Sequence, residues 1–149
     1  MPPAVIDIQL TSAPVQYVPV EHIANDSGGE CVFLGRTRAE SHTRHGSLTR
    51  LSYEAYQPMA LEVLHQLAEH ARQRFGCQFV RIHHALGEVA PGEASVLVQT
   101  VCERRAAAFE SCRFLIDQLK SHAPIWKREE WADGSTWSTG IPVKVESSL

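Results

Sequence analysis

The chain has 149 residues, of which 44% are hydrophobic and 21% charged, and its formal net charge is −3. These values are typical of a single soluble globular domain that buries a core without disulfides or metals. The mild acidity argues against nucleic acid or an anionic membrane as a partner, so any positively charged site must be a local cluster.

The compartment is predicted from the N-terminus and the cysteines. The N-terminal residues Met1-Pro2-Pro3-Ala4 lack the pattern of a signal peptide, and no apolar run is long enough to span a bilayer. We therefore expect a cytosolic protein. The four cysteines are scattered without CxxC spacing, which favours small buried side chains over a thiol nucleophile or sulfur carrier. They are Cys31, Cys77, Cys102 and Cys112.

The N-terminal third predicts two strands and the turns between them. Residues 4–10 alternate like a strand, residues 20–24 suit a helical turn, and Ser-Gly-Gly at 27–29 indicates a tight turn. Residues 30–35 form a short apolar run ending in glycine, which predicts a buried strand. The polar residues 36–47 predict a loop.

The middle of the chain predicts a strand, a helix and a hairpin. Residues 48–56 alternate, with the split expected of a sheet covered in part on both faces. Residues 58–75 form the clearest helix, which starts at Pro58 and is capped by Gly76. Its apolar stripe consists of Ala60, Leu64, Leu67, Ala68, Ala71 and Phe75. Residues 79–86 and 94–102 predict an antiparallel hairpin with a long loop.

A second helix is predicted at residues 105–121, ending before Pro124 because proline disfavours helical geometry at Ala123. We expect its buried face to consist of Phe109, Cys112, Ile116 and Leu119. The tail from Trp131 predicts one edge strand at residues 141–145. Strands interrupted by two helices indicate an α+β fold with a mainly antiparallel sheet.

The most unusual segment is residues 119–129, where Lys120 and Lys127 lie on either side of Pro124. The proline favours extended backbone, so Lys127 can fold back towards the end of the helix. Two ammonium groups held together without acids lower each other's pKa, and an anionic ligand would bridge them. Ordinary salt bridges to Asp117 and to the glutamates after Lys127 remain the alternative from spacing alone.

Two further clusters are basic. Residues 36–50 carry four arginines against one acid, and this basic region is either a solvated loop or an anion clamp. Arg104 and Arg105 lie where a strand meets the second helix. Cations are misplaced at a helix N-terminus, so this pair suggests contacts with a ligand or partner.

The eight histidines do not predict a metal site. His42 and His45 have no third ligand nearby, and the adjacent His83 and His84 point to opposite faces of a strand. A metal-dependent hydrolase is therefore the weakest of the functional alternatives.

Several motifs together resemble one family, the large catalytic subunit of molybdopterin synthase (MoaE type). They are FLGRTR (33–38), LSYEAYQPMA (51–60), GEVAPGEASVLV (87–98), AAFESCRFLIDQLK (107–120) and APIWKRE (123–129). The match runs in order over about residues 29–137 of a single predicted domain, residues 1–149. The resemblance implies an α/β hammerhead fold.

The resemblance also implies a function in molybdenum cofactor biosynthesis. The family converts cyclic pyranopterin monophosphate (precursor Z) to molybdopterin by inserting two sulfurs as a dithiolene. The sulfur comes from a thiocarboxylate on the C-terminal Gly-Gly of a small ubiquitin-like subunit. The large subunit forms a central homodimer with a small subunit at each end. No cofactor, metal, nucleic acid or membrane is expected.

Residue roles implied by the resemblance fall into two groups. Lys120 and Lys127 match the catalytic pocket lysines. The positions that match substrate-binding residues are Phe33, Arg36, Thr37, Arg38, Arg104, Arg105, Arg128 and Glu129. Arg104 and Arg105 match a His-Arg pair that reaches over from the other protomer.

The chain departs from the family pattern at two positions. Arg104 replaces a histidine, and Ala85 replaces the arginine of a His-Arg pair that begins at His84. Arginine can contact phosphate but does not titrate near neutral pH. The competing hypothesis is therefore a non-catalytic paralogue that binds the ubiquitin-like tail without turnover.

Overall fold

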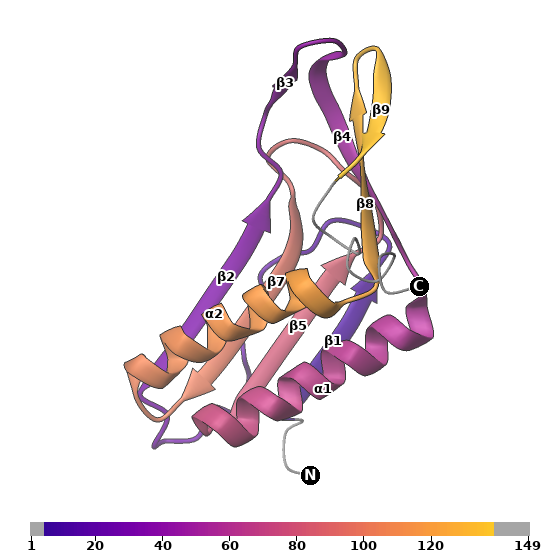
Figure 1. Ribbon diagram of the computed structural model, residues 1–149. Coiled ribbons are helices and arrows are strands. Elements are labelled where there is room, and N and C mark those ends of the chain that lie inside the picture. The colour runs from indigo at the N-terminus through magenta and orange to yellow at the C-terminus, as the bar shows by residue number, and fades with distance from the viewer. Residues whose placement is uncertain (1–4, 139–149) are drawn as a thin grey trace.

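The computed structural model describes residues 5–138, which form two β-sheets and two long helices (Figure 1). The first sheet has the order β1-β5-β7-β2. Its strands are β1 (Ile6–Thr11), β5 (Phe79–Ala85), β7 (Ala94–Cys102) and β2 (Gly29–Arg36). Strand β1 is parallel to β5 and the other neighbours are antiparallel.

The second sheet stands at one end of the first and has the order β3-β4-β8-β9, with β6 also paired to β4 (Figure 1). Its strands are β3 (Ser41–His42), β4 (Gly46–Ala55), β6 (Gly87–Val89), β8 (Ile125–Trp131) and β9 (Gly134–Trp137). All of its pairings are antiparallel. The predicted α+β class and the predicted β5–β7 hairpin are confirmed.

Helices α1 (Gln57–Phe75) and α2 (Arg105–His122) lie side by side on one face of the first sheet (Figure 1). Helix α1 buries Ala60, Leu64, Ala68 and Ala71, which lie on one face of the helix. Gly76 closes it in the left-handed conformation, with φ of 71°, and donates its N–H to the carbonyl of Arg72. The predicted stripe and cap are both confirmed.

Helix α2 has a different buried face from the one predicted. It buries Ala108, Ser111, Cys112, Leu115, Ile116 and Leu119. Phe109 is 65% exposed, so its assignment to the core is wrong. The small side chains of Ala108 and Ser111 let the helix approach strand β7, and Thr100 donates a hydrogen bond to the carbonyl of Ala108 at 3.0 Å. Phe109 instead lies beside the edge strand β2.

The second sheet explains the imperfect alternation of residues 48–56. A bulge between Leu48 and Arg50 inserts one extra residue in β4, so Leu48 and Leu51 are both buried. The β8–β9 hairpin, which turns at Ala132 and Asp133, was not predicted. Strand β3 and the start of β4 also interrupt the predicted loop. The edge strand predicted at residues 141–145 lies outside the described residues.

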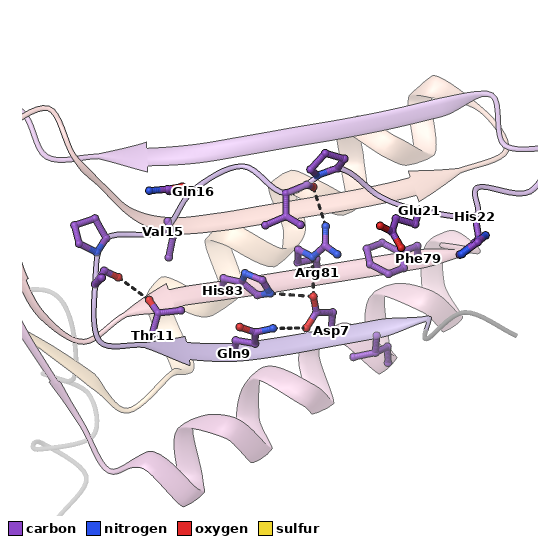
Figure 2. A pocket seen from close by; sticks show the side chains of 15 residues that line it. Asp7, Gln9, Thr11, Val15, Gln16, Glu21, His22, Phe79, Arg81 and His83 are labelled. Atoms are coloured by element: carbon purple, nitrogen blue, oxygen red, sulfur yellow. Dashed lines mark hydrogen bonds and ion pairs between the residues drawn. The ribbon is translucent and has the colours of Figure 1, made fainter. Parts of the chain in front are cut away.

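Residues 12–28 cross the face of the first sheet that the helices leave uncovered (Figure 2). The predicted helical turn at residues 20–24 is wrong, because His22 has φ of 57°, outside the right-handed helical region. The turn predicted at 27–29 falls slightly earlier, where Ser27 donates its N–H to the carbonyl of Ala24. Neither helix among residues 5–138 is long and apolar enough to cross a membrane.

The four cysteines, far apart in the sequence, gather around α2 as free thiols. Cys77, Cys102 and Cys112 are buried, and Cys31 is half-buried. Cys77 and Cys102 have their sulfur atoms 3.6 Å apart. The prediction of small buried side chains is confirmed for three of the four.

Candidate active site

Lys120 and Lys127 line one small cavity where α2 passes into β8. Ala123 leaves the helix in an extended conformation, with φ of −72° and ψ of 132°, and Pro124 prevents the helix from continuing. The chain therefore turns back, and β8 carries Lys127 to the end of α2 that bears Lys120. The predicted convergence of the two lysines is present in the structure.

The cavity has a volume of about 40 Å³ and no carboxylate in its wall. Its polar lining consists of the two lysines, Tyr53, His84 and Ser95, and its apolar lining of Val96, Ile116, Leu119, Ala123 and Ile125. This is room for a few atoms, far less than a drug-sized ligand occupies. A larger substrate must lie across the mouth of the cavity, with only a narrow end group inside.

The lysine cavity is electrostatically unusual. Burial lowers the pKa of Lys127, and the charge of Lys120 lowers it further, against a weaker opposing effect of Glu129 and Glu40. Neither lysine has a hydrogen-bond or ion-pair partner among residues 5–138. The alternative of ordinary salt bridges therefore does not hold in the described part of the chain, because the acid near Lys120, Asp117, pairs with Arg113.

Three polar residues of the cavity were not predicted as site residues: Tyr53, His84 and Ser95. Tyr53 lies opposite Lys127 in the β4–β8 register and donates a hydrogen bond from its hydroxyl to Ser95 Oγ at 3.1 Å. Burial raises the pKa of Tyr53. These residues come from three strands, so only the strand pairing could have revealed them.

The basic loop after β2 lies outside the lysine cavity. Arg36 donates to the carbonyl of Gly92 at 3.0 Å, and the Arg38 side chain is 85% exposed with Glu40 4.0 Å away. Thr37 is buried, and its hydroxyl has no partner among residues 5–138. The Arg38 side chain is thus largely in solvent and accessible to a ligand, whereas the Arg36 side chain is partly held by its hydrogen bond to the protein backbone.

Phe33 lies in a neighbouring groove between β2 and α2. The groove shares Ile116 with the lysine cavity and also contains Cys31, Val32, Phe109, Cys112, Arg113 and Asp117. Phe33 is 39% exposed there. It therefore belongs to a surface that continues from the cavity rather than to the cavity wall.

Arg128 and Glu129 point to opposite faces of β8, as neighbours in a strand must. Glu129 shares the face of Lys127 and accepts a hydrogen bond from Thr136 at 2.9 Å. Arg128 lies on the other face, where it pairs with Glu130 at 3.6 Å and stacks over Trp137. A substrate contact by Arg128 stays a prediction, and this strand geometry does not favour it.

Arg104 and Arg105 lie at the opposite end of α2 from Lys120. The helix rise over 15 residues separates the two ends by about 22 Å. Within one chain these arginines cannot join the lysines at a common ligand.

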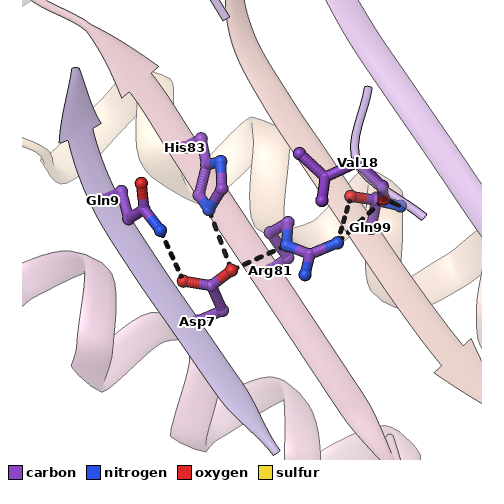
Figure 3. Close-up of polar contacts among 6 residues, drawn as sticks. All are labelled: Asp7, Gln9, Val18, Arg81, His83 and Gln99. Carbon is purple, nitrogen blue, oxygen red and sulfur yellow. Dashed lines mark hydrogen bonds and ion pairs between the residues drawn. The ribbon is translucent and has the colours of Figure 1, made fainter. Parts of the chain in front are cut away.

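A second polar cluster, on the uncovered face of the first sheet, was not predicted at all (Figures 2 and 3). Asp7 Oδ2 accepts hydrogen bonds from Arg81 Nε at 2.7 Å and from His83 Nε2 at 3.0 Å. Arg81 also donates to Gln99 and to the carbonyl of Val18. The cluster borders a cavity of about 770 Å³ beneath residues 13–22. Its charges are paired with one another, which is typical of a structural network.

No group of three or more His, Cys, Asp or Glu side chains within residues 5–138 is arranged to hold a metal ion. His42 and His45 stack on each other instead, with ring centroids 4.6 Å apart, and His42 also contacts Trp131.

The fold and the lysine cavity define a class of protein that sequence comparison identifies. The model of the family described as "MoaE protein" matches residues 8–122. The chain is 40% identical over 130 residues to the molybdopterin synthase catalytic subunit of Nostoc sp., covering 86% of this chain and 79% of that protein. It is 34% identical to the Pyrococcus abyssi protein of the same name, covering 92% and 96%.

Solved structures agree with the sequence relatives. Molybdopterin synthase from Staphylococcus aureus has a TM-score of 0.77 at 29% identity, covering 87% of this chain and 94% of that one. The MoaE protein from Burkholderia ambifaria has a TM-score of 0.68 at 26% identity, covering 96% and 98%. The chain therefore belongs to the MoaE family, whose members named above are catalytic subunits of molybdopterin synthase, an enzyme of molybdenum cofactor biosynthesis.

Proposed function

We propose that this chain converts precursor Z to molybdopterin, as the single-domain large subunit of a cytoplasmic molybdopterin synthase. The observation that carries the proposal is the lysine cavity, where two cations share a narrow space that no carboxylate of the described residues enters. Such a cavity attracts an anionic end group of small cross-section. A thiocarboxylate on an extended Gly-Gly tail has that charge and that width.

In this mechanism the tail of a small ubiquitin-like subunit enters the cavity and the pterin lies across its mouth. Lys120 and Lys127 hold the thiocarboxylate, and one of them, Lys120 in our assignment, transfers a proton as sulfur attacks and the cyclic phosphate opens. Water then cleaves the acyl–sulfur bond, which leaves the sulfur on the pterin and a carboxylate on the tail. Lys127 suits the binding role because it is the more buried of the two. A solved structure with the same fold, from Helicobacter pylori, is described as a complex of subunits 1 and 2 of molybdopterin-converting factor, which is consistent with a second subunit.

The phosphate requires further cations, and Arg38, Arg104 and Arg105 are the candidates. Arg38 is exposed to solvent and belongs to the same protomer as the two lysines. The other two are too far from the lysines within one chain, so the site is incomplete without a second copy. The exposed edge strand β2 and helix α2 provide a surface for that copy.

The surface for a second copy is apolar and borders the cavity. Val32 and Phe33 on β2 are each 39% exposed, and Phe109 on α2 is 65% exposed. Strand β2 ends the order of the first sheet, so its outer edge is available for pairing among the described strands. If two copies pair antiparallel along β2, their α2 helices also run antiparallel. The partner's Arg104 and Arg105 then approach Lys120 and Lys127 of the first copy.

A single-turnover assay with thiocarboxylated small subunit tests the catalytic assignment. We expect Lys120→Ala and Lys127→Ala to lose dithiolene formation while still folding. Unimpaired formation by both variants would exclude the mechanism. A wild-type protein that captures the small subunit but does not convert precursor Z would instead support the non-catalytic paralogue.

Mixing two inactive variants tests the shared site. A Lys120→Ala chain still supplies Arg105, and an Arg105→Ala chain still supplies Lys120. Random reassortment makes half of the dimers mixed, each with one intact site, so we expect about a quarter of the wild-type rate. No recovery after refolding the two chains together would place Arg105 outside the lysine site.

A further inference from the structure

His84 lies at the lysine cavity but has no role in the mechanism above. It is on β5, paired with Val96 of β7, and is only 5% exposed. Its ring meets the Tyr53 ring edge-on, with centroids 5.0 Å apart. The neighbouring His83 points to the other face of the sheet, where Asp7 binds it (Figure 3). Among the described residues, His84 is therefore the one imidazole that shares the cavity with Lys120 and Lys127.

The protonation of His84 follows from its backbone contact. Its Nδ1 lies 2.7 Å from the carbonyl oxygen of Ala85, which can only accept a hydrogen bond. Nδ1 therefore carries the proton. Burial lowers the pKa of His84 to about 4, and the charges of Lys120 and Lys127 act in the same direction. At neutral pH the ring is uncharged, and Nε2 offers a lone pair.

The Nε2 lone pair accepts no hydrogen bond from any of the described residues. Among residues 5–138 the only hydrogen bond of His84 is the one through Nδ1. Lys120 and Lys127, for their part, carry three donors each and have no acceptor among these residues. An acceptor without a donor and two donors without an acceptor thus share one small cavity.

We propose that His84 is a positioning residue that accepts a hydrogen bond at Nε2 from the ammonium group of Lys120 and fixes it in the cavity. Lys120 is the chosen donor because its charge acts on His84 more strongly than that of Lys127. The inference rests on the proposed function of this cavity as an anion site.

The chemistry explains why a histidine suits this position better than an acid. A carboxylate would also accept from the lysine, but it would cancel the positive charge that the anionic ligand needs. A neutral imidazole orients the ammonium group and leaves both charges in place. Because its pKa lies far below that of a lysine, it holds the proton donor without removing the proton.

Nitrogen NMR of the isolated large subunit tests the contact without any turnover. The His84 signals are assigned by their loss in His84→Gln. We expect the Nδ1-protonated form at pH 7, and an Nε2 shift that moves towards that of a free acceptor in Lys120→Met and moves less in Lys127→Met. A proton on Nε2, or an Nε2 signal indifferent to Lys120→Met, would overturn the proposal.

Single-turnover kinetics test the consequence. Glutamine places an amide oxygen near the position of Nε2, whereas leucine fills similar space without an acceptor. We expect His84→Leu to lower the rate about tenfold, the worth of one lost hydrogen bond, with unchanged affinity for the small subunit. His84→Gln should retain most of the rate.

An equal loss in both variants, with unchanged melting temperatures, would show that the acceptor does not matter. If His84→Leu does not fold, the NMR comparison of the two lysine variants still decides the question. If the wild-type protein lacks synthase activity but the NMR contact is present, the proposed function fails and the positioning contact stands.

Discussion

The two faces of strand β5 carry adjacent histidines in opposite electrostatic settings. On the face of His83, the carboxylate of Asp7 lies between a guanidinium and an imidazole, and each charge has a partner (Figure 3). On the face of His84, two lysines and a neutral imidazole share a cavity without an acid. The paired face has the larger cavity, whereas the unpaired face has the cavity that we propose as the active site. Unpaired charge, rather than cavity size, distinguishes the site in this molecule.

The largest effect we expect comes from the unpaired face. Lys127→Met should lower the rate of dithiolene formation by about 10³-fold, within the range typical of a lost group that holds a reacting anion. Thermal unfolding should show unchanged or raised stability, because a half-buried ammonium without a partner is removed. A large fall in the melting temperature of this variant would show that Lys127 has a structural role after all.

The two faces should also respond to acid in different pH ranges. The unfolded chain protonates His84 near pH 6.5, whereas the folded protein keeps it neutral down to about pH 4, next to Lys120, Lys127 and Tyr53. The unfolded state thus gains the proton first, and stability falls by about 3 kcal/mol as the pH drops through this range. Urea unfolding at several pH values measures the loss.

The His84→Gln variant should lack that loss, and the exposed His65→Gln is its matched control. An identical pH dependence in all three proteins would contradict the assignment.

Below the pH range of His84, the stability of the protein depends on the protonation of Asp7. Burial works to raise the pKa of Asp7, but hydrogen bonds from Arg81 and His83 outweigh it and lower the pKa. Its contribution is therefore present above pH 3.8 and lost as the pH falls further.

A smaller effect is expected on breaking the paired face. Asp7→Ala leaves the buried Arg81 without its carboxylate, which should cost about 2 kcal/mol, less than a fully buried pair because Asp7 is partly exposed. Activity per folded molecule should not change. Chemical denaturation measures the loss of stability, and the single-turnover assay measures the activity. A selective loss of activity would mean that the paired face contributes to the site.

The smallest effect concerns a neutral hydrogen bond beside the lysines. Tyr53→Phe removes the hydroxyl that donates to Ser95 but keeps the ring against His84, so we expect a loss of about 1 kcal/mol in stability. Ser95→Ala should match it, and the double variant should lose little more than either alone. Fully additive losses would show that the two residues do not act through this contact.

The sequence predicted those parts of the fold that depend on local patterns. The stripe of α1, the glycine at its end and the proline after α2 each determine backbone geometry within a few residues. It failed where tertiary contacts decide. Phe109 has helical spacing for the core, but the small Ala108 and Ser111 take that place. The β8–β9 hairpin contains the turn signal Asp-Gly at 133–134, but the residues around it are rich in Gly, Ser and Thr and lack the pattern of a strand.

The candidate site divides in the same way. Lys120 and Lys127 could be brought together from the sequence because one proline turn separates them. His84, Tyr53 and Ser95 join them through strand pairings that no local pattern specifies. The substrate-binding positions Phe33, Arg36, Thr37, Arg38, Arg104, Arg105, Arg128 and Glu129 stay predictions. In the proposed site, their convergence requires a second copy and the ligand.

The gathering of the four cysteines around α2 has a consequence for the handling of activated sulfur. Thiocarboxylates and thiols exchange when the thiol is ionised and accessible. Burial raises the pKa of Cys77 to about 12 and that of Cys112 as well above its usual range. These thiols stay protonated and shielded in the interior. In the proposed mechanism, Cys77 and Cys112 therefore do not compete for the reactive sulfur that the carrier delivers to the lysines, and its cargo is protected from capture by them on the way to the pterin.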